Sequence, residues 1–172
     1  MGNAYAPMVT RLMRQGLPGE ALQSALSNVA HAPDDPRALS TLAHTLMATG
    51  DYAGADAAAG RAVALAENEP AFRFLHARTR FVLGDYTSAL AESEAGRSYS
   101  ASGESSYYLE SCSLLAAACL VAVGQSDRAL ELLAGVGESC VVRAGQPLTK
   151  AAVMAEGKAR RLRQEHVPRS AG

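Results

Sequence analysis

The sequence predicts an all-α protein built from four stacked helical hairpins, and three observations predict it. Apolar residues recur at helical spacing, as at Leu39, Leu42, Ala43 and Leu46. Glycines interrupt these runs at a regular period: Gly16, Gly50 and Gly84 are 34 residues apart, and Gly124 follows 40 residues later. An alanine stands five residues after each glycine, at Ala21, Ala55, Ala89 and Ala129. Two short helices joined by a glycine-containing turn form one hairpin, and the repeat indicates four of them.

The composition agrees with a helical domain that has a real core. The chain has 172 residues, of which 48% are hydrophobic, 5% are aromatic and none is Trp. The core must therefore consist of Ala, Leu and Val, whose small size lets helices approach closely. Residues typical of strands are sparse and period-two runs are missing, so no sheet is expected.

The hairpins follow in order along residues 3–33, 36–69, 70–99 and 105–136. In the first, residues 16–19 form the turn. Pro36 and Pro70 begin the second and third hairpins, at the helical position where the missing N–H of proline has no cost. The polar stretch 98–106 predicts a longer loop before the fourth hairpin.

Beyond residue 136 the pattern changes. Residues 137–147 are expected to form a linker, extended around 140–142, and residues 148–166 a last helix. Because a stack of repeats leaves an apolar face at its end, this helix is predicted to cap the stack. Its expected apolar side consists of Leu148, Ala151, Ala152, Ala155 and Leu162. Residues 167–172 are expected to be a disordered tail.

Charge and cysteine content limit the class of protein. Residues 1–149 carry 10 basic and 15 acidic groups, a net charge of −5, whereas residues 150–172 carry 6 and 2, a net charge of +4. This balance argues against a nucleic-acid-binding protein. The three cysteines show no pairing pattern, which fits a reducing compartment and buried thiols. No signal-peptide pattern and no apolar run of membrane-spanning length occur, so we expect a cytoplasmic protein without membrane insertion.

The repeat resembles the tetratricopeptide repeat (TPR). The sequence Gly-Asp-Tyr stands at the turns of the second and third hairpins, at residues 50–52 and 84–86. The first and fourth hairpins keep the glycine and the later alanine but have Pro18 and Ser126 in place of the tyrosine. The small residue of the first helix falls at Val9, Ala43, Ala77 and Ala117. The resemblance implies a right-handed superhelical stack, an α-solenoid, with a concave groove lined by the first helix of each hairpin.

The third repeat departs from this pattern. Arg73, His76 and Arg80 stand where the family has large apolar residues, while Phe74 and Phe81 fall where the family faces its groove. Two interpretations are open. Either the helix is rotated and both phenylalanines belong to the core, or they line an apolar groove together with Met47 of the preceding repeat.

Projected by the phase of the family, the groove has a basic side and an apolar side. Its predicted partner-binding residues are Arg14, Arg37, His44, Met47, Phe74, Arg78, Phe81, Leu114 and Val121, with Thr10, Met13, Ser40 and Ala118 beside them. The basic side suits a peptide with acidic residues or a free carboxylate; the alternative is a scattered solvated face. Some TPR proteins bind the terminal carboxylate of heat-shock chaperones, but the matching positions here are Ala6, Thr10, Thr41, Ala71 and Leu75. We therefore predict that this chain is not a heat-shock co-chaperone of that kind.

No enzyme signature is present in the sequence. The glycines lie in hairpin turns, and the four histidines fall in different units, so neither a catalytic site nor a metal or cofactor is expected. The resemblance implies an interaction module whose partner is another protein or a peptide. Its size and content resemble small bacterial chaperones or adaptors for secreted clients. The alternative is a structural scaffold subunit that uses its convex face or its C-terminal cap, and self-association stays open.

Overall fold

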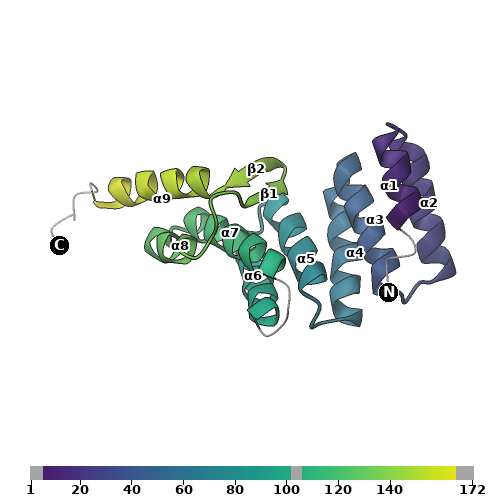
Figure 1. The fold of residues 1–172 in the computed structure, drawn as a ribbon, viewed down its shortest axis with the longest axis horizontal. Helices are drawn as coiled ribbons and strands as arrows, with labels where there is room; N and C mark the ends of the chain where they lie inside the picture. The colour runs from purple at the N-terminus through teal and green to yellow at the C-terminus, as the bar shows by residue number, and fades with distance from the viewer. Residues whose placement is uncertain (1–5, 102–105, 166–172) are drawn as a thin grey trace, which may run out of the picture.

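Helices dominate the part of the chain that the structure, a computed structural model, describes: residues 6–101 and 106–165. Four antiparallel pairs follow one another and stack side by side (Figure 1). Their bounds are α1 Ala6–Arg14 and α2 Pro18–His31, α3 Pro36–Thr49 and α4 Tyr52–Leu65, α5 Pro70–Val82 and α6 Tyr86–Ala101, and α7 Ser106–Ala122 and α8 Ser126–Leu133. The predicted all-α stack of helical hairpins is confirmed.

The repeated Gly-Asp-Tyr has a simple structural role. The four turn glycines have φ between 74° and 88°, a left-handed conformation that ends the first helix of each pair. The following aspartate caps the second helix, since Asp51 Oδ1 accepts the amide of Gly54 at 2.9 Å and Asp85 Oδ1 that of Ser88 at 3.1 Å. Tyr52 and Tyr86 then begin α4 and α6.

The periodic alanines are buried between the packed helices. All four alanines that follow the turn glycines have no exposed surface, and the small residues of the first helices are also buried: Val9, Ala43, Ala77 and Ala117. A larger side chain at any of these positions would force the paired helices apart, because protein interiors are close-packed.

The second half of the molecule is organised around α7. Every residue from 111 to 121 is buried, because α5, α6, α8, α9 and the β-hairpin all contact this helix. Cys112 and Cys119 lie in it as fully buried thiols, and burial raises the pKa of each to about 12. A separate apolar cluster joins α1 to α4 and reaches Leu75 of α5.

The expected linker at 137–147 is instead mostly an antiparallel β-hairpin. Strand β1 (Val141–Ala144) pairs with β2 (Gln146–Thr149) around Gly145, whose φ is 73°. Val142 and Ala144 are buried toward the helices, while Val141 and Arg143 are exposed. Only two residues of the strand point inward, so the alternation was too short to identify from sequence.

Helix α9 (Lys150–Glu165) extends along α7 and α8 at the end of the molecule opposite α1 (Figure 1). The apolar face predicted for it is wrong: Ala151, Ala152, Ala155 and Leu162 are exposed, and Val153 and Gly157 are buried. Gly157 decides the face, because a Cβ there would lie 3.3 Å from Val121 Cγ2. Leu148, counted in this helix from the sequence, belongs to β2.

One other boundary differs from expectation. Helix α6 continues through Ala101, so residues 98–101 of the predicted loop are helical. The rest of that loop up to residue 105, the start of the first hairpin at residues 3–5, and the predicted tail at 167–172 lie outside the described residues.

Candidate functional site: the concave cleft

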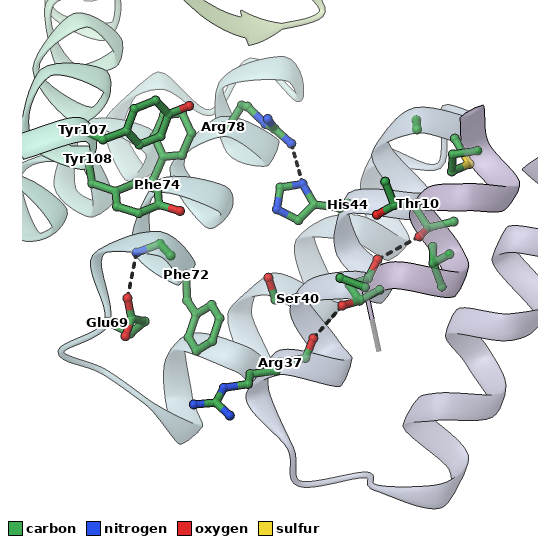
Figure 2. Close-up of a pocket in the computed structure, with 17 residues that line it drawn as sticks. Thr10, Arg37, Ser40, His44, Glu69, Phe72, Phe74, Arg78, Tyr107 and Tyr108 are labelled. Carbon is green, nitrogen blue, oxygen red and sulfur yellow. Dashed lines mark hydrogen bonds between the residues drawn. The ribbon is translucent and has the colours of Figure 1, made fainter. Parts of the chain in front are cut away.

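A concave cleft with a volume of about 730 Å³ is lined by residues from the first helix of each pair: α1, α3, α5 and α7. Figure 2 shows its labelled side chains, which come from all four helices and from Glu69 just before α5. The second helices contribute none of the described residues that line it. This arrangement is the one that the resemblance implied for the groove.

An aromatic wall closes one side of the cleft. Phe74 of α5 packs on Tyr108 of α7 with ring centroids 6.0 Å apart, and Tyr108 meets Tyr107 edge-on at 5.1 Å. Phe74 is 8% exposed, whereas Tyr107 is 67% exposed. Burial, followed by the charge of neighbouring groups, raises the pKa of Tyr108, so the phenol stays protonated and can donate a hydrogen bond. The wall therefore offers an apolar surface with polar tips.

Arg78 projects from α5 beside this wall. Its Nη2 donates to His44 Nδ1 at 3.1 Å and approaches Met47 Sδ at 3.2 Å, and its guanidinium lies 5.9 Å from the Phe74 ring centroid. Its Nε is buried and has no hydrogen-bond partner. Burial is the main cause that lowers the pKa of Arg78, which indicates a partly desolvated cation.

His44 faces Arg78 from α3 (Figure 2). Because arginine can only donate, Nδ1 of His44 must accept, and the neutral ring carries its proton on Nε2. The ring is open to the cleft, but the walls around it displace water, and this desolvation together with Arg78 lowers the pKa of His44 to about 4. At neutral pH, His44 is therefore an uncharged donor beside a cation.

The hydroxyls of α3 contribute less donor capacity than the sequence suggests. Thr41 Oγ1 donates to Arg37 O at 2.9 Å, and Thr45 Oγ1 donates to Thr41 O at 2.8 Å. Both protons are thus bound within the helix. Charged and donor groups along the cleft come chiefly from Arg37, His44 and Arg78, and Glu69 is the acidic residue among its described lining.

The predicted groove residues fall into three groups. Arg37, His44, Phe74 and Arg78 line the cleft, as do Thr10, Met13 and Ser40. Met47 is partly buried under the cleft, in contact with Arg78. The others are elsewhere: Arg14 is exposed at the end of α1, Phe81 packs against Tyr86, and Leu114, Ala118 and Val121 are buried in the core around α7.

Of the two interpretations of the third repeat, the groove interpretation fits Phe74 and the core interpretation fits Phe81. Phe74 belongs to the core cluster and also lines the cleft, whereas Phe81 packs on the core away from the cleft lining. Sequence reasoning missed Phe72, Tyr107 and Tyr108. Helix α7 begins 18 residues before its turn glycine, whereas α5 begins 14 before its own, and this extra turn brings the two tyrosines to the cleft.

The unusual polar residues of the third repeat lie on the other side of α5. His76 is 5% exposed, with Nε2 3.2 Å from Asp56 Oδ1 and Nδ1 3.3 Å from Glu92 Oε1. Arg73 pairs with Glu92 at 2.8 Å, and Arg80 pairs with Asp56 at 3.3 Å. We call these five residues the ionic cluster. It joins α4, α5 and α6 where the family uses apolar packing.

Charges in the ionic cluster are matched. Burial alone would raise the pKa of Glu92, but hydrogen bonds from His76 and Arg73 outweigh it and lower the value to about 2. The imidazole packs on Gly60 of α4, where a Cβ would lie at contact distance, 3.4 Å from His76 Nε2. In the described part of the chain, no three His, Cys, Asp or Glu residues could hold a metal ion together, and no described helix is long and apolar enough to cross a membrane.

Solved structures resemble this chain, although their sequences differ from it. MamA 41-end from Desulfovibrio magneticus RS-1 superposes with a TM-score of 0.65 at 21% identity, over 76% of this chain and 70% of that one. The Sgt2 TPR domain from Aspergillus fumigatus gives 0.63 at 18% identity, over 72% and 80%. The TPR2B domain of yeast Sti1, solved as a pHsp70 complex, gives 0.53 at 16% identity, over 88% and 91%.

The comparisons by sequence find no match, either to a protein-family model or to a curated protein. The assignment of the fold therefore depends on the helical stack, the 34-residue glycine period and the solved structures together. On these grounds, the chain has the fold of the tetratricopeptide-repeat proteins.

Proposed function

We propose that this protein is a non-catalytic interaction module that holds a segment of a partner polypeptide in the concave cleft. The observation that carries the proposal is the composition of the cleft: an aromatic wall, two arginines and a neutral histidine along about 730 Å³. Aromatic and arginine side chains are the types that dominate binding energy at protein interfaces. In support, the TPR2B domain of yeast Sti1, which shares the fold, was solved as a complex with pHsp70.

The more specific form of the proposal is an adaptor or chaperone for a secreted client, acting in the cytoplasm of a bacterium. The cleft supports a chaperone because its apolar wall is partly open, with Tyr107 67% exposed. Such a wall can cover an apolar segment that the client must not expose before assembly. Four of the five heat-shock positions, Ala6, Thr10, Thr41 and Ala71, do line the cleft, but they offer no cation, so a different client is expected.

The test is capture of partners from an extract of the source organism by three forms of the protein. The wild type is compared with a cleft variant, Arg37→Glu with Tyr107→Ala, and an end-helix variant, Arg161→Glu with Arg163→Glu. All four side chains are exposed, so both variants should stay folded, which circular dichroism checks. Partners that are lost only from the cleft variant support the proposal.

The scaffold alternative makes the opposite prediction. A subunit that uses its C-terminal end would lose its partners through the end-helix variant and keep them in the cleft variant. Capture of several subunits of one assembly with that pattern would replace the cleft proposal. Light scattering of the purified protein separately determines whether the chain self-associates.

A further inference from the structure

The clearest unexplained feature of the cleft is that its partly buried cation lacks a carboxylate. Two other arginines of α5 pair with carboxylates, Arg73 with Glu92 and Arg80 with Asp56. Arg128 of α8 and Arg161 of α9 pair with Glu94 and Asp127. Arg78 forms no ion pair with any residue that the structure describes, and its buried Nε has no hydrogen-bond partner.

A desolvated cation without a counter-ion is unfavourable, and a bound anion would offset this cost. Glu69 does not meet this need, because its carboxylate accepts the amide of Ala71 at the first turn of α5, two turns before Arg78. His44 holds the Arg78 guanidinium through Nδ1 and leaves its own Nε2–H as a further donor. Two donors of different residues thus adjoin one open volume.

We propose that Arg78 and His44 form a carboxylate subsite, and that the partner segment places an internal Asp or Glu side chain there with an aromatic or aliphatic residue beside it. The guanidinium fork suits a planar carboxylate, and the bond is charge-assisted. The adjacent apolar residue would pack on Phe74, Tyr107 and Tyr108. This inference depends on the proposed function of the cleft and specifies the chemistry of its ligand.

The charge of the protein favours a polypeptide over a nucleic acid for this subsite. Residues 1–149, which contain the cleft, carry a net charge of −5, so a polyphosphate chain would be repelled along most of its length. A single carboxylate between apolar residues meets no such repulsion.

The experiment selects peptides from a displayed random library on the full-length protein. The forms compared are the wild type, Arg78→Gln and Arg14→Gln, the last being the loss of one exposed arginine at the end of α1, outside the cleft lining. The wild type and Arg14→Gln should both enrich an acidic residue next to an aromatic or aliphatic one. Arg78→Gln should keep the apolar preference and lose the acidic one.

An enriched peptide is then synthesised with its acidic residue and with the matching amide, Asn for Asp or Gln for Glu. The wild type should bind the acidic form about 10- to 100-fold more tightly, the ratio expected of a charged hydrogen bond. Arg78→Gln should discriminate less than about twofold. Arg78→Lys, which keeps the charge without the fork, provides a second variant if Arg78→Gln fails to fold.

The outcomes separate the two proposals. If no peptide binds the wild type, the proposed function of the cleft fails. Selected peptides without an acidic residue, or an acidic preference that Arg78→Gln keeps, would overturn the subsite alone. Loss of binding on amidation of the peptide C-terminus would show a terminal carboxylate and contradict an internal one, and Arg78-dependent binding of oligouridine would contradict a polypeptide ligand.

Discussion

Helix α5 carries two polar faces that differ in one respect, which is whether their charges are matched. On the face toward α4 and α6, Arg73, His76 and Arg80 meet Asp56 and Glu92 within 2.8 to 3.3 Å. On the face toward the cleft, Arg78 meets a neutral histidine, a thioether and an aromatic ring. The residues of each face recur at intervals of three and four, so both patterns belong to one regular helix.

This difference separates stability from binding. A buried ion pair need not stabilise a fold relative to apolar residues, but removing one partner leaves a charge that is costly. The ionic cluster is therefore expected to be required for stacking of the third hairpin. The face toward the cleft is unmatched in the free protein, and that is the condition under which a ligand can complete it.

The largest expected effect comes from breaking the matched face. Glu92→Ala leaves Arg73 without its carboxylate and His76 with Asp56 alone, in a site where Glu92 is 15% exposed. We expect the free energy of unfolding to fall by about 3–5 kcal/mol, the range for one partner of a buried pair. Urea denaturation followed by circular dichroism measures it.

Glu131→Ala, on the exposed surface of α8, is the matched control and should change stability by no more than about 0.5 kcal/mol. A loss at Glu92 no larger than that of the control would mean that the ionic cluster does not hold the stack together.

Low pH should reduce the contribution of the ionic cluster to the free energy of unfolding. The pKa of Glu92 is about 2 in the fold against an ordinary value of 4.5, so its contribution is present above pH 4.5 and disappears as pH falls toward 2. The contribution is on the order of 3 kcal/mol by proton linkage. Urea midpoints measured at intervals between pH 5 and pH 2 give the slope.

Glu92→Gln removes the titrating group and should flatten the slope in this window, while other carboxylates still titrate. Equal slopes for wild type and Glu92→Gln would contradict the assignment. The pKa of His44, about 4, lies within the same window, but His44 is present in both proteins, so the difference between their slopes reports Glu92.

Removing the cation of the cleft-facing side of α5 should not reduce stability, in contrast to Glu92→Ala. Arg78→Met removes a partly desolvated charge and keeps an unbranched side chain between Phe74 and Met47. We expect the free energy of unfolding to stay the same or to rise by about 1 kcal/mol, because apolar replacement of buried charge is neutral or stabilising. The measurement is again urea denaturation, beside Glu92→Ala.

A loss of more than about 1 kcal/mol in Arg78→Met would show that Arg78 is structural, like Arg73. The two faces of α5 would then not differ in the way proposed.

Much of the fold could be predicted because its signals are local. Gly50, Asp51 and Tyr52 end one helix, cap the next and begin it within three residues, so the sequence alone predicts a hairpin. Cleft residues such as Arg37, His44 and Arg78 followed from the same period, although Arg14 and Phe81, predicted in the same way, lie outside the cleft lining. Positions that depend on contacts distant in sequence could not be derived this way.

Three features of the structure could not be predicted from the sequence. Val121 and Leu114 keep the phase of the groove, yet α9 and the β-hairpin cover α7, and those segments have no counterpart in the repeat. The buried face of α9 is decided by Gly157, which a search for apolar residues passes over. The ionic cluster was visible only as a departure from the family pattern, because its carboxylates, Asp56 and Glu92, come from other helices.

The smallest predicted effect is a change in the pKa of His44, and it tests the cleft-facing side of α5 most directly. The pKa of His44 is about 4, lowered first by desolvation and second by the charge of Arg78. Arg78→Met removes the second cause and keeps most of the first, so the pKa should rise but stay below its ordinary value of 6.5. NMR titration of the His44 ring protons between pH 3 and pH 8 gives both values.

Binding of an acidic peptide to the wild type should raise the same pKa, because a carboxylate at the subsite favours the protonated ring. An unchanged titration in both experiments would mean that His44 and Arg78 do not act as one site.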